Sequence, residues 1–337
     1  MNDVPASASD ADGLGRVLAG TDIRIPEMGV GTWAWGDKRT WGMGGYDTDL
    51  TLDTITAAWQ TSIDAGITLF DTAEAYGEGE SERIIGRLLT EDPGRAGRAV
   101  IASKFMPMPW KLNVKRSLVD AAKASRERLG VEAIDLYQIH GPISLRGIPA
   151  QAEALAEAHA QGLVRALGIS NFSAKETRRF DSELRKRDLR LASNQVEFSL
   201  LRTIPIASGL LDVCAQLDVV VLAYSPMGQG RLTGKYSAEH PPPGSRNFST
   251  YPMAEIDPLV EQLRQIGAAH DRTPAQVALR WLIQRGSVPI PGAKNAQQAA
   301  DNAGATGWEL TRTEMLTLND AAFPGIWTMK NRIWQHG

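Results

Sequence analysis

The segment IDLYQIHGPISLRGIPAQAEALAEAHAQGLVRALGIS spans residues 134–170 and contains one complete strand–helix–strand pattern. Short, largely apolar runs at 134–139 and 164–169 bound the segment. The stretch between them, about 149–161, has helical periodicity, and Gly162 stands where a glycine commonly ends a helix. Parallel strands buried on both faces have this apolar character, so the segment predicts a β–α–β unit.

The same alternation continues in both directions along the chain. The predicted strands are 28–32, 67–71, 99–103, 134–139, 164–169, 192–197, 219–223 and 288–290. The predicted helices are about 51–65, 81–90, 113–129, 149–161, 173–186, 207–217, 274–285 and 295–303, and Ser173 with Glu176 forms a capping-box pattern. Eight repeats with no linker or break in composition favour a (β/α)8 TIM barrel over a doubly wound sheet with a second domain.

Composition narrows the class of partner. The chain has 337 residues, 43% of them hydrophobic, and a formal net charge of -3, which is typical of a soluble globular protein. This charge offers no basic field for nucleic acid or an anionic membrane, so a small molecule is the favoured partner. No apolar run approaches the roughly 18 residues that span a bilayer. We therefore expect a cytoplasmic protein, with a monomer as the favoured state.

The chain ends and the single cysteine give three further expectations. Residues 1–13 are rich in Ala, Ser and Asp, lack the features of a signal or transit peptide, and are expected to be a disordered tail. Residues 14–337 are expected to form a single barrel domain. Cys214 is the only cysteine, so an intrachain disulfide is excluded and a buried structural thiol is expected.

Three further segments complete the predicted barrel. Residues 17–19 and 23–25 flank a turn and predict a β-hairpin that closes the bottom of the barrel. Two long connections, about 33–50 and 224–256, follow the carboxyl ends of strands. Because that end is the catalytic face of a barrel, substrate and cofactor contacts are expected in these loops.

Four polar residues follow consecutive strands and converge on this face. Asp71, Lys104 and His140 stand at strand ends, and Tyr76 lies in the loop after Asp71. A tyrosine, with an ordinary pKa of about 10, needs a nearby cation to act as an acid near neutrality, and Lys104 can supply it. Asp71 would keep that lysine charged. His140 could donate a hydrogen bond to a carbonyl oxygen, so the set predicts proton donation by Tyr76 to a carbonyl.

A metal-dependent barrel hydrolase is the alternative from another reaction class. It requires paired His, Asp or Glu ligands at strand ends, and no such pair accompanies His140, so we predict no metal site. The other histidines, His159, His240, His270 and His336, are expected to be solvated.

Later strands carry groups that suit a dinucleotide. Residues 168–172 and 194–197 offer amide and hydroxyl groups for a carboxamide, and 224–235 places an aromatic ring before a glycine-rich segment. Lys294 stands at a helix start, where its charge suits a 2′-phosphate. No Rossmann fingerprint follows a strand, so a nicotinamide cofactor would lie extended across the barrel rim.

Taken in order, these segments resemble the aldo-keto reductase family over about residues 15–305. The resemblance is carried by FDTAEAYG at 70–77, ASK at 102–104, LYQIH at 136–140, GISNF at 168–172, NQVE at 194–197, and the runs at 224–235 and 290–302. The long, tryptophan-rich first loop, 33–47, resembles a plant and bacterial branch that includes pyridoxal reductases.

The resemblance implies a role for each matching position. Asp71, Tyr76, Lys104 and His140 would form the catalytic tetrad, and the cofactor would be NADP(H). Positions implied to contact it are Gly31, Thr32, Trp33, Asp71, Ser170, Asn171, Gln195, Tyr224, Ser225, Pro226, Met227, Gly228, Gly230, Leu232, Lys235, Gly292, Lys294, Gln298 and Asn302. Many members carry arginine where Lys294 stands, and some carry another where Gln298 stands, so modest discrimination against NAD is implied.

The expected activity is NADPH-dependent reduction of an aldehyde or ketone. Trp33, Trp35 and Trp110, together with Tyr76 and His140, are the expected walls of the substrate pocket. The alternative within the same fold is an NADP(H)-binding regulatory or interaction subunit with little turnover, similar to potassium-channel β-subunits.

Overall fold

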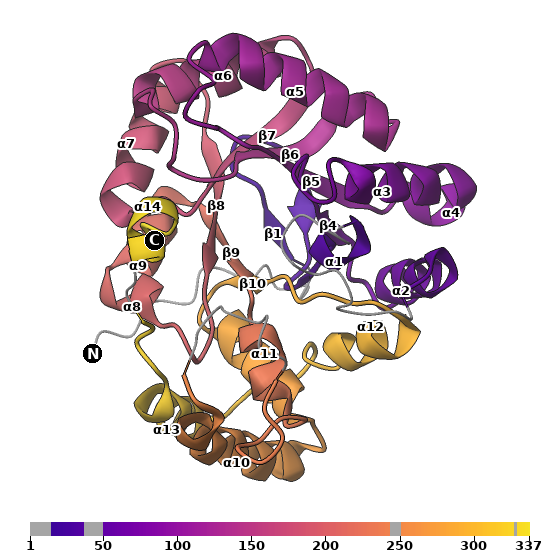
Figure 1. Ribbon diagram of the computed structural model, residues 1–337, viewed down its shortest axis with the longest axis vertical. Coiled ribbons are helices and arrows are strands. Elements are labelled where there is room, and N and C mark those ends of the chain that lie inside the picture. Colours follow the sequence, from indigo (N-terminus) through magenta and orange to yellow (C-terminus); the bar gives the residue numbers. More distant parts are fainter. Residues whose placement is uncertain (1–14, 37–49, 243–250, 327–328) are drawn as a thin grey trace.

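The computed structural model describes residues 15–36, 50–242, 251–326 and 329–337. The expected disordered tail and most of the first long loop lie outside these residues. Within them, eight parallel strands form the predicted barrel, with neighbours in chain order (Figure 1). They are β3 (Gly29–Gly31), β4 (Leu69–Asp71), β5 (Val100–Phe105), β6 (Ile134–Ile139), β7 (Val164–Ser170), β8 (Leu191–Glu197), β9 (Val220–Tyr224) and β10 (Val288–Pro289).

The barrel closes at two glycines. Gly31 forms a parallel bridge with Gly292, and the Gly31 amide donates to the Pro291 carbonyl at 3.0 Å. A Cβ at Gly31 would lie 2.8 Å from the Ile290 carbonyl oxygen, closer than packed atoms allow. Glycine therefore permits the close approach of the first and last strands.

An outer ring of helices alternates with the strands, as predicted. These helices are α2 (Leu52–Asp64), α3 (Glu80–Glu91), α5 (Val114–Leu129), α6 (Ile148–Ala160), α7 (Ala174–Arg185), α9 (Leu210–Leu217), α11 (Pro274–Gln284) and α12 (Ala296–Ala303). The capping box of α7 is confirmed: Ser173 and Glu176 exchange hydrogen bonds. The helix predicted at 207–217 is interrupted, because Gly209 adopts a left-handed conformation between α8 (Ile204–Ala207) and α9.

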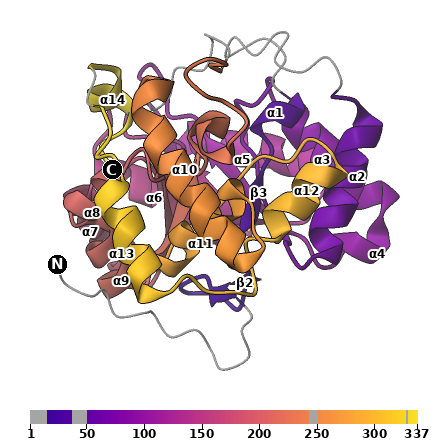
Figure 2. The ribbon, with the colours of Figure 1, turned by 90° about the horizontal axis from the view of Figure 1, so that it is seen from below.

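Several helices lie in segments that were predicted to be loops or for which no element was predicted. The first long connection begins with a helical turn, α1 (Trp33–Gly36). The second contains η1 (Gly228–Thr233) and the start of α10 (Met253–His270). The remaining short helices are α4 (Pro93–Ala96), α13 (Arg312–Ala321) and α14 (Met329–Trp334). Figure 2 shows α10 and α13 packed side by side.

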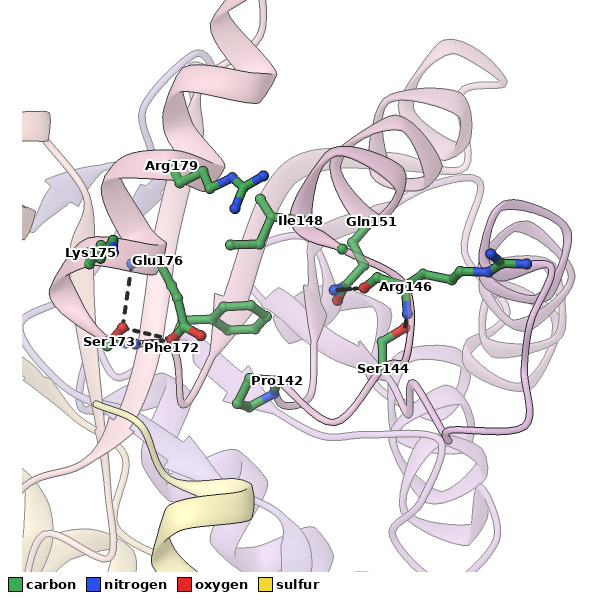
Figure 3. Close-up of a pocket in the computed structure, with 11 residues that line it drawn as sticks. Pro142, Ser144, Arg146, Ile148, Gln151, Phe172, Ser173, Lys175, Glu176 and Arg179 are labelled. Atoms are coloured by element: carbon green, nitrogen blue, oxygen red, sulfur yellow. Dashed lines mark hydrogen bonds between the residues drawn. The ribbon is translucent and has the colours of Figure 1, made fainter.

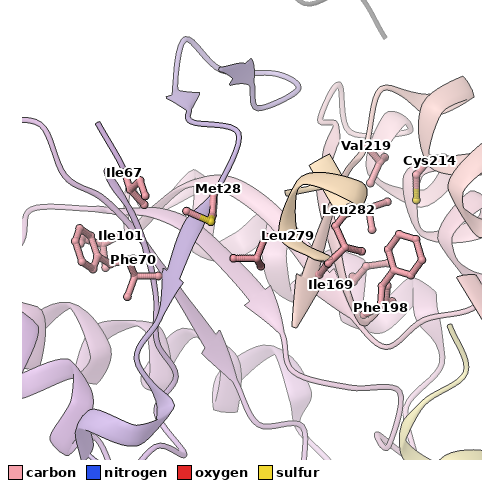
Figure 4. Packing of buried hydrophobic residues seen from close by; sticks show 14 of the residues in the cluster. Met28, Ile67, Phe70, Ile101, Ile169, Phe198, Cys214, Val219, Leu279 and Leu282 are labelled. Carbon is pink, nitrogen blue, oxygen red and sulfur yellow. The ribbon is translucent and has the colours of Figure 1, made fainter. Parts of the chain in front are cut away.

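The core has two parts because the side chains of each strand alternate between the inside and outside of the barrel. Outward-facing residues pack against the helices, and Figure 4 draws part of this layer, including Phe70, Ile101 and Phe198. Cys214 belongs to this outer layer, and burial raises the pKa of its thiol to about 12, consistent with the predicted structural role.

Inward-facing residues form a smaller cluster inside the barrel. Leu69, Ala102, Leu136 and Leu222 represent the strands in this cluster, and Leu18, Ile23 and Ile25 enter it from the predicted hairpin. That hairpin pairs β1 (Arg16–Val17) with β2 (Arg24–Ile25) in antiparallel fashion. It therefore plugs one end of the barrel, which leaves the opposite, carboxyl end for polar side chains.

Candidate active site

The structure brings the four predicted catalytic side chains together at the carboxyl end of the barrel. Asp71 ends β4, Lys104 lies near the end of β5, and His140 immediately follows β6. Asp71 and Lys104 stand two residues after inward-facing Leu69 and Ala102, so alternation turns both side chains inward as well. Tyr76 reaches the same point from the β4–α3 loop.

Lys104 is fully buried, and the structure gives each of its ammonium protons an acceptor. Its Nζ donates to Asp71 Oδ2 at 2.6 Å, to the Thr72 carbonyl at 2.7 Å and to the Tyr76 hydroxyl at 3.3 Å. Burial lowers the pKa of Lys104, and the charge of Asp71 opposes that shift. The lysine thus relies on Asp71 to remain a cation in an environment without water.

Tyr76 presents its oxygen to that cation. Because the hydroxyl oxygen accepts from Lys104, the phenol's own proton is directed elsewhere. The ammonium also lies 4.9 Å from the centre of the Tyr76 ring. The loop around the tyrosine is held by hydrogen bonds from the Tyr76 amide to Ala73 and from the Ser81 amide to the Tyr76 carbonyl.

His140 lies edge-on to Tyr76, with ring centres 5.7 Å apart. Burial, reinforced by the positive charge of Lys104, lowers the pKa of His140 well below its ordinary value. The imidazole is therefore neutral at physiological pH and can offer a single N–H as a hydrogen-bond donor. Its Nδ1 is buried without a hydrogen-bond partner.

Asp71 has further partners inside the barrel. Gln195 donates to Asp71 Oδ1 at 2.7 Å, and Gln138 donates to the same oxygen at 3.3 Å. Gln138 was missed by the sequence analysis, although its position two residues before His140 places it on the same face of β6. Gln195, predicted to hold a carboxamide, uses part of its amide to orient Asp71.

The other residues predicted to hold a carboxamide lie around His140. Asn171 Nδ2 donates to the His140 carbonyl at 3.3 Å and to Ser170 Oγ at 3.1 Å, and Ser170 Oγ donates to the Gln195 carbonyl at 2.9 Å. The Tyr224 hydroxyl donates to Asn171 Oδ1 at 2.9 Å. These side chains thus form one hydrogen-bonded network beside His140.

The predicted pyrophosphate segment forms the compact turn η1. Gly228 and Gly230 both have positive φ, as do Ser225 and Gln229, while Pro226 is buried and Met227 half-buried. Lys235 is exposed beyond this turn, with its ammonium 4.8 Å from the Tyr236 ring centre. The Leu232 side chain is fully buried in the apolar core, so this residue anchors the turn.

The predicted adenosine-binding residues gather at the start of α12. The Lys294 amide donates to Gln298 Oε1 at 3.0 Å, and Asn302 Nδ2 donates to the Gly292 carbonyl at 3.2 Å. Gly292 is exposed next to Gly31, so bare backbone borders this part of the rim. Thr32 is buried beside Asp71, and its hydroxyl donates to the Asp71 carbonyl at 2.9 Å.

The three tryptophans predicted to line the substrate pocket differ in their exposure to solvent. Trp35 is only 1% exposed, its Nε1 donates to the Ala293 carbonyl at 2.7 Å, and its ring packs against Phe70. The prediction that Trp35 lines the substrate pocket is therefore wrong, because the turn of α1 directs this side chain into the core. Trp33 is half-buried, and Trp110 is 70% exposed after β5.

A hollow of about 420 Å³ lies beside the catalytic cluster, between the amino ends of α6 and α7. Figure 3 shows its lining, with Phe172 and Ile148 below Arg179 and with Arg146 across from Lys175. The catalytic tetrad is absent from its lining. The hollow is therefore separate from the four side chains at the strand ends.

The chain's last residues also reach the site, which the sequence analysis did not anticipate. The Trp334 ring lies 5.6 Å from His140, and Gln335 Nε2 donates at 2.6 Å to both the Tyr224 hydroxyl and Glu197 Oε2. His336, expected to be solvated, instead lies 3.0 Å from Glu176 Oε1. No periodicity or motif marks these positions. His270 also departs from the expectation by pairing with Glu314 at 2.8 Å.

The described part of the chain contains neither a candidate metal cluster nor a candidate membrane-spanning helix. No group of three or more His, Cys, Asp or Glu residues is placed to hold a metal ion there. Among the same residues, no helix has both the length and the apolar character needed to cross a membrane.

Comparison with known proteins places this arrangement in a family. The family model for the aldo/keto reductase family matches residues 27–322. The chloroplastic pyridoxal reductase of Arabidopsis thaliana is 36% identical, with 93% of this chain and 87% of that protein aligned. The glycerol dehydrogenase of Gluconobacter oxydans superimposes with a TM-score of 0.79 at 28% identity, over 95% of this chain and 99% of that one.

A related structure contains a cofactor. An aldo/keto reductase from Klebsiella pneumoniae, solved in complex with NADP and acetate, has a TM-score of 0.69 and 26% identity, covering 94% of this chain and 97% of that one. Together with the family match over most of the chain, these similarities establish that this protein belongs to the aldo/keto reductase family.

Proposed function

We propose that this protein reduces an aldehyde or ketone to an alcohol with NADPH, and that Tyr76 is the general acid. The observation that carries the proposal is the hydrogen bond from the buried Lys104 ammonium to the Tyr76 oxygen. A cation at this position stabilises the phenolate that forms when the proton leaves. Asp71 and the Thr72 carbonyl hold the ammonium in place.

The other residues orient the carbonyl group. Neutral His140 offers an N–H to the carbonyl oxygen, and its position edge-on to Tyr76 directs both donors to one point. Tyr76 then transfers its proton to that oxygen. The nicotinamide cofactor, when bound, supplies the hydride to the carbonyl carbon.

The residues at the ends of β7 to β10 fit NADP(H). Ser170, Asn171 and Gln195 would hold the carboxamide, and Tyr224 would stack on the ring. The 225–232 turn would cover the pyrophosphate, while Lys294, Gln298 and Asn302 would hold the adenosine end. The positive charge of Lys294 beside the first turn of α12 favours the 2′-phosphate of NADP over NAD.

Half-buried Trp33 and exposed Trp110 remain proposed contacts for an apolar or aromatic substrate. The similarity to a pyridoxal reductase makes pyridoxal a suitable member of a substrate panel that also contains sugars, aromatic aldehydes and ketones. The cytoplasmic location, the monomeric state and the single-domain organisation of residues 14–337 stay predictions.

A Tyr76→Phe variant tests the mechanism. NADPH consumption with this panel should fall by about 10²- to 10⁴-fold, the usual contribution of a general acid, because the phenol proton is gone. NADPH binding should persist, which calorimetry can measure. Full activity in the variant would exclude Tyr76 as the proton donor.

The same panel tests the regulatory alternative. NADP(H) binding without turnover of any carbonyl by the wild-type protein, combined with co-purification of a partner, would favour an interaction subunit. Titration with NADPH and NADH measures the proposed cofactor preference.

A further inference from the structure

We propose that Gln335, in the C-terminal tail, is a positioning residue that directs the Tyr224 proton to Asn171 and so holds the Asn171 amide in place at the nicotinamide end of the site. The C-terminal tail comprises residues 334–337, beginning with the last residue of α14. This inference rests on the proposed NADP(H) binding. It assigns a role at that site to a segment outside the catalytic strands.

The C-terminal tail lies across the carboxyl ends of the strands. The His336 amide donates to the Asn171 carbonyl at 2.9 Å, and Trp334 packs against His140 and Gly141. Gly337 packs against the Phe172 carbonyl, where an added Cβ would lie at 2.7 Å. Figure 1 shows α14 and the C-terminus beside α7 and α9. The tail is thus held by both backbone and side chains.

A buried ion pair fixes the orientation of Gln335. Glu197 lies 3.6 Å from Arg202, and both side chains are buried. An ionised carboxylate can only accept hydrogen bonds, so the amide group of Gln335 that faces Glu197 must be its NH₂. Gln335 is only 4% exposed, and this same NH₂ also reaches the Tyr224 hydroxyl at 2.6 Å.

That bond determines the direction of the next one. Since the Tyr224 oxygen accepts from Gln335, its proton is donated to Asn171 Oδ1 at 2.9 Å. On its other side Asn171 donates from Nδ2 to the His140 carbonyl and to Ser170 Oγ. Both polar atoms of the Asn171 side chain therefore have partners, and the amide is held in one orientation beside His140. The carboxylate of Glu197 thus sets the polarity of the Gln335 amide and the Tyr224 hydroxyl.

A Gln335→Met variant removes both hydrogen bonds while keeping a side chain of similar length. We expect the affinity for NADP⁺ to fall about tenfold, equivalent to roughly one hydrogen bond. The affinity for 2′,5′-ADP, which lacks the nicotinamide, should not change. Isothermal titration calorimetry measures both, and Gln265→Met, an exposed glutamine on α10, is the matched control.

A charge exchange separates positioning from simple attachment of the tail. In the Glu197→Gln/Gln335→Glu double variant the two side chains can bond again and a carboxylate stays near the buried Arg202, so unfolding stability should exceed that of Glu197→Gln alone. The carboxylate at position 335 would then accept the Tyr224 proton, and Asn171 Oδ1 would face a hydroxyl oxygen that has no proton to donate to it. NADP⁺ affinity should therefore stay low even though stability recovers.

Three results would overturn the proposal. They are unchanged NADP⁺ affinity in Gln335→Met, equal loss of affinity for NADP⁺ and 2′,5′-ADP, and recovery of NADP⁺ affinity in the double variant. Failure of the wild-type protein to bind either ligand is a different result. It would overturn the proposed function and, with it, this inference.

Discussion

At the scale of single residues, the Asp71–Lys104 pair has the largest energetic consequence. Both side chains are buried, and Nζ and Oδ2 are 2.6 Å apart. Removing one member of such a pair leaves a charge in the core without a partner, whereas removing both leaves none. The pair is therefore expected to behave as a unit in stability as well as in catalysis.

We predict that Lys104→Met lowers the free energy of unfolding by about 3–5 kcal/mol, the usual cost of breaking a buried ion pair. The Asp71→Asn/Lys104→Met double variant should recover much of this stability, because the uncompensated carboxylate is gone. Both should lack carbonyl reductase activity. Urea unfolding measures the stabilities, and a double variant less stable than Lys104→Met would contradict the prediction.

At the scale of elements, α1 fixes the loop that carries Tyr76. Gly77 has a φ of 60°, and a Cβ at this position would overlap the Gly36 carbonyl. A Cβ at Gly36 would likewise overlap the Ser81 amide. These two glycines let the end of α1 and the β4–α3 loop approach closely, and this contact holds the loop that carries Tyr76.

We predict that Gly77→Ala lowers both stability and kcat, because the overlap forces the Tyr76 loop away from Lys104. Gly66→Ala is the control: Gly66 also has a positive φ, 83°, but a Cβ there meets no atom within 4 Å. The control should lose only about 1–2 kcal/mol from left-handed strain and keep its kcat. Equal kcat values for the two variants would show that the close contact does not position Tyr76.

At the scale of the whole molecule, His140 couples stability to pH. Its pKa is well below the ordinary value in the folded protein, whereas the unfolded chain takes up the proton near pH 6.5. As the pH falls below 6.5, the unfolded state is stabilised and the folded state is not. Folding stability therefore decreases in this window, until the pH reaches the folded pKa.

We predict that the free energy of unfolding of the wild-type protein drops by about 1 kcal/mol between pH 6.5 and 5.5 through this histidine alone. His140→Asn should remove that part of the slope, whatever its effect on stability at pH 7.5. Urea unfolding of both proteins across this range measures the difference. Parallel curves would mean that His140 takes up its proton at the same pH in the folded and unfolded states.

The barrel and its tetrad could be predicted because their signals are local. Each strand is a short apolar run, and a polar residue at its carboxyl end is expected at the catalytic face of the barrel. The sequence therefore determined the eight repeats, the hairpin and the positions of Asp71, Tyr76, Lys104 and His140. Helix ends such as Ser173 were also readable, since a capping box involves residues only three positions apart.

Only the tertiary structure decided which side chains face each other. The register between β7 and β8 shifts, so Leu167 pairs with Leu191 but Gly168 pairs with Ser193. As a result, Ala192 and Gln195 both point into the barrel, which simple alternation does not allow. The contacts of Trp35 with Ala293 and of Gln335 with Tyr224 were also decided only by the tertiary structure. Each joins residues more than 100 positions apart, and local sequence patterns carry no information about such pairs.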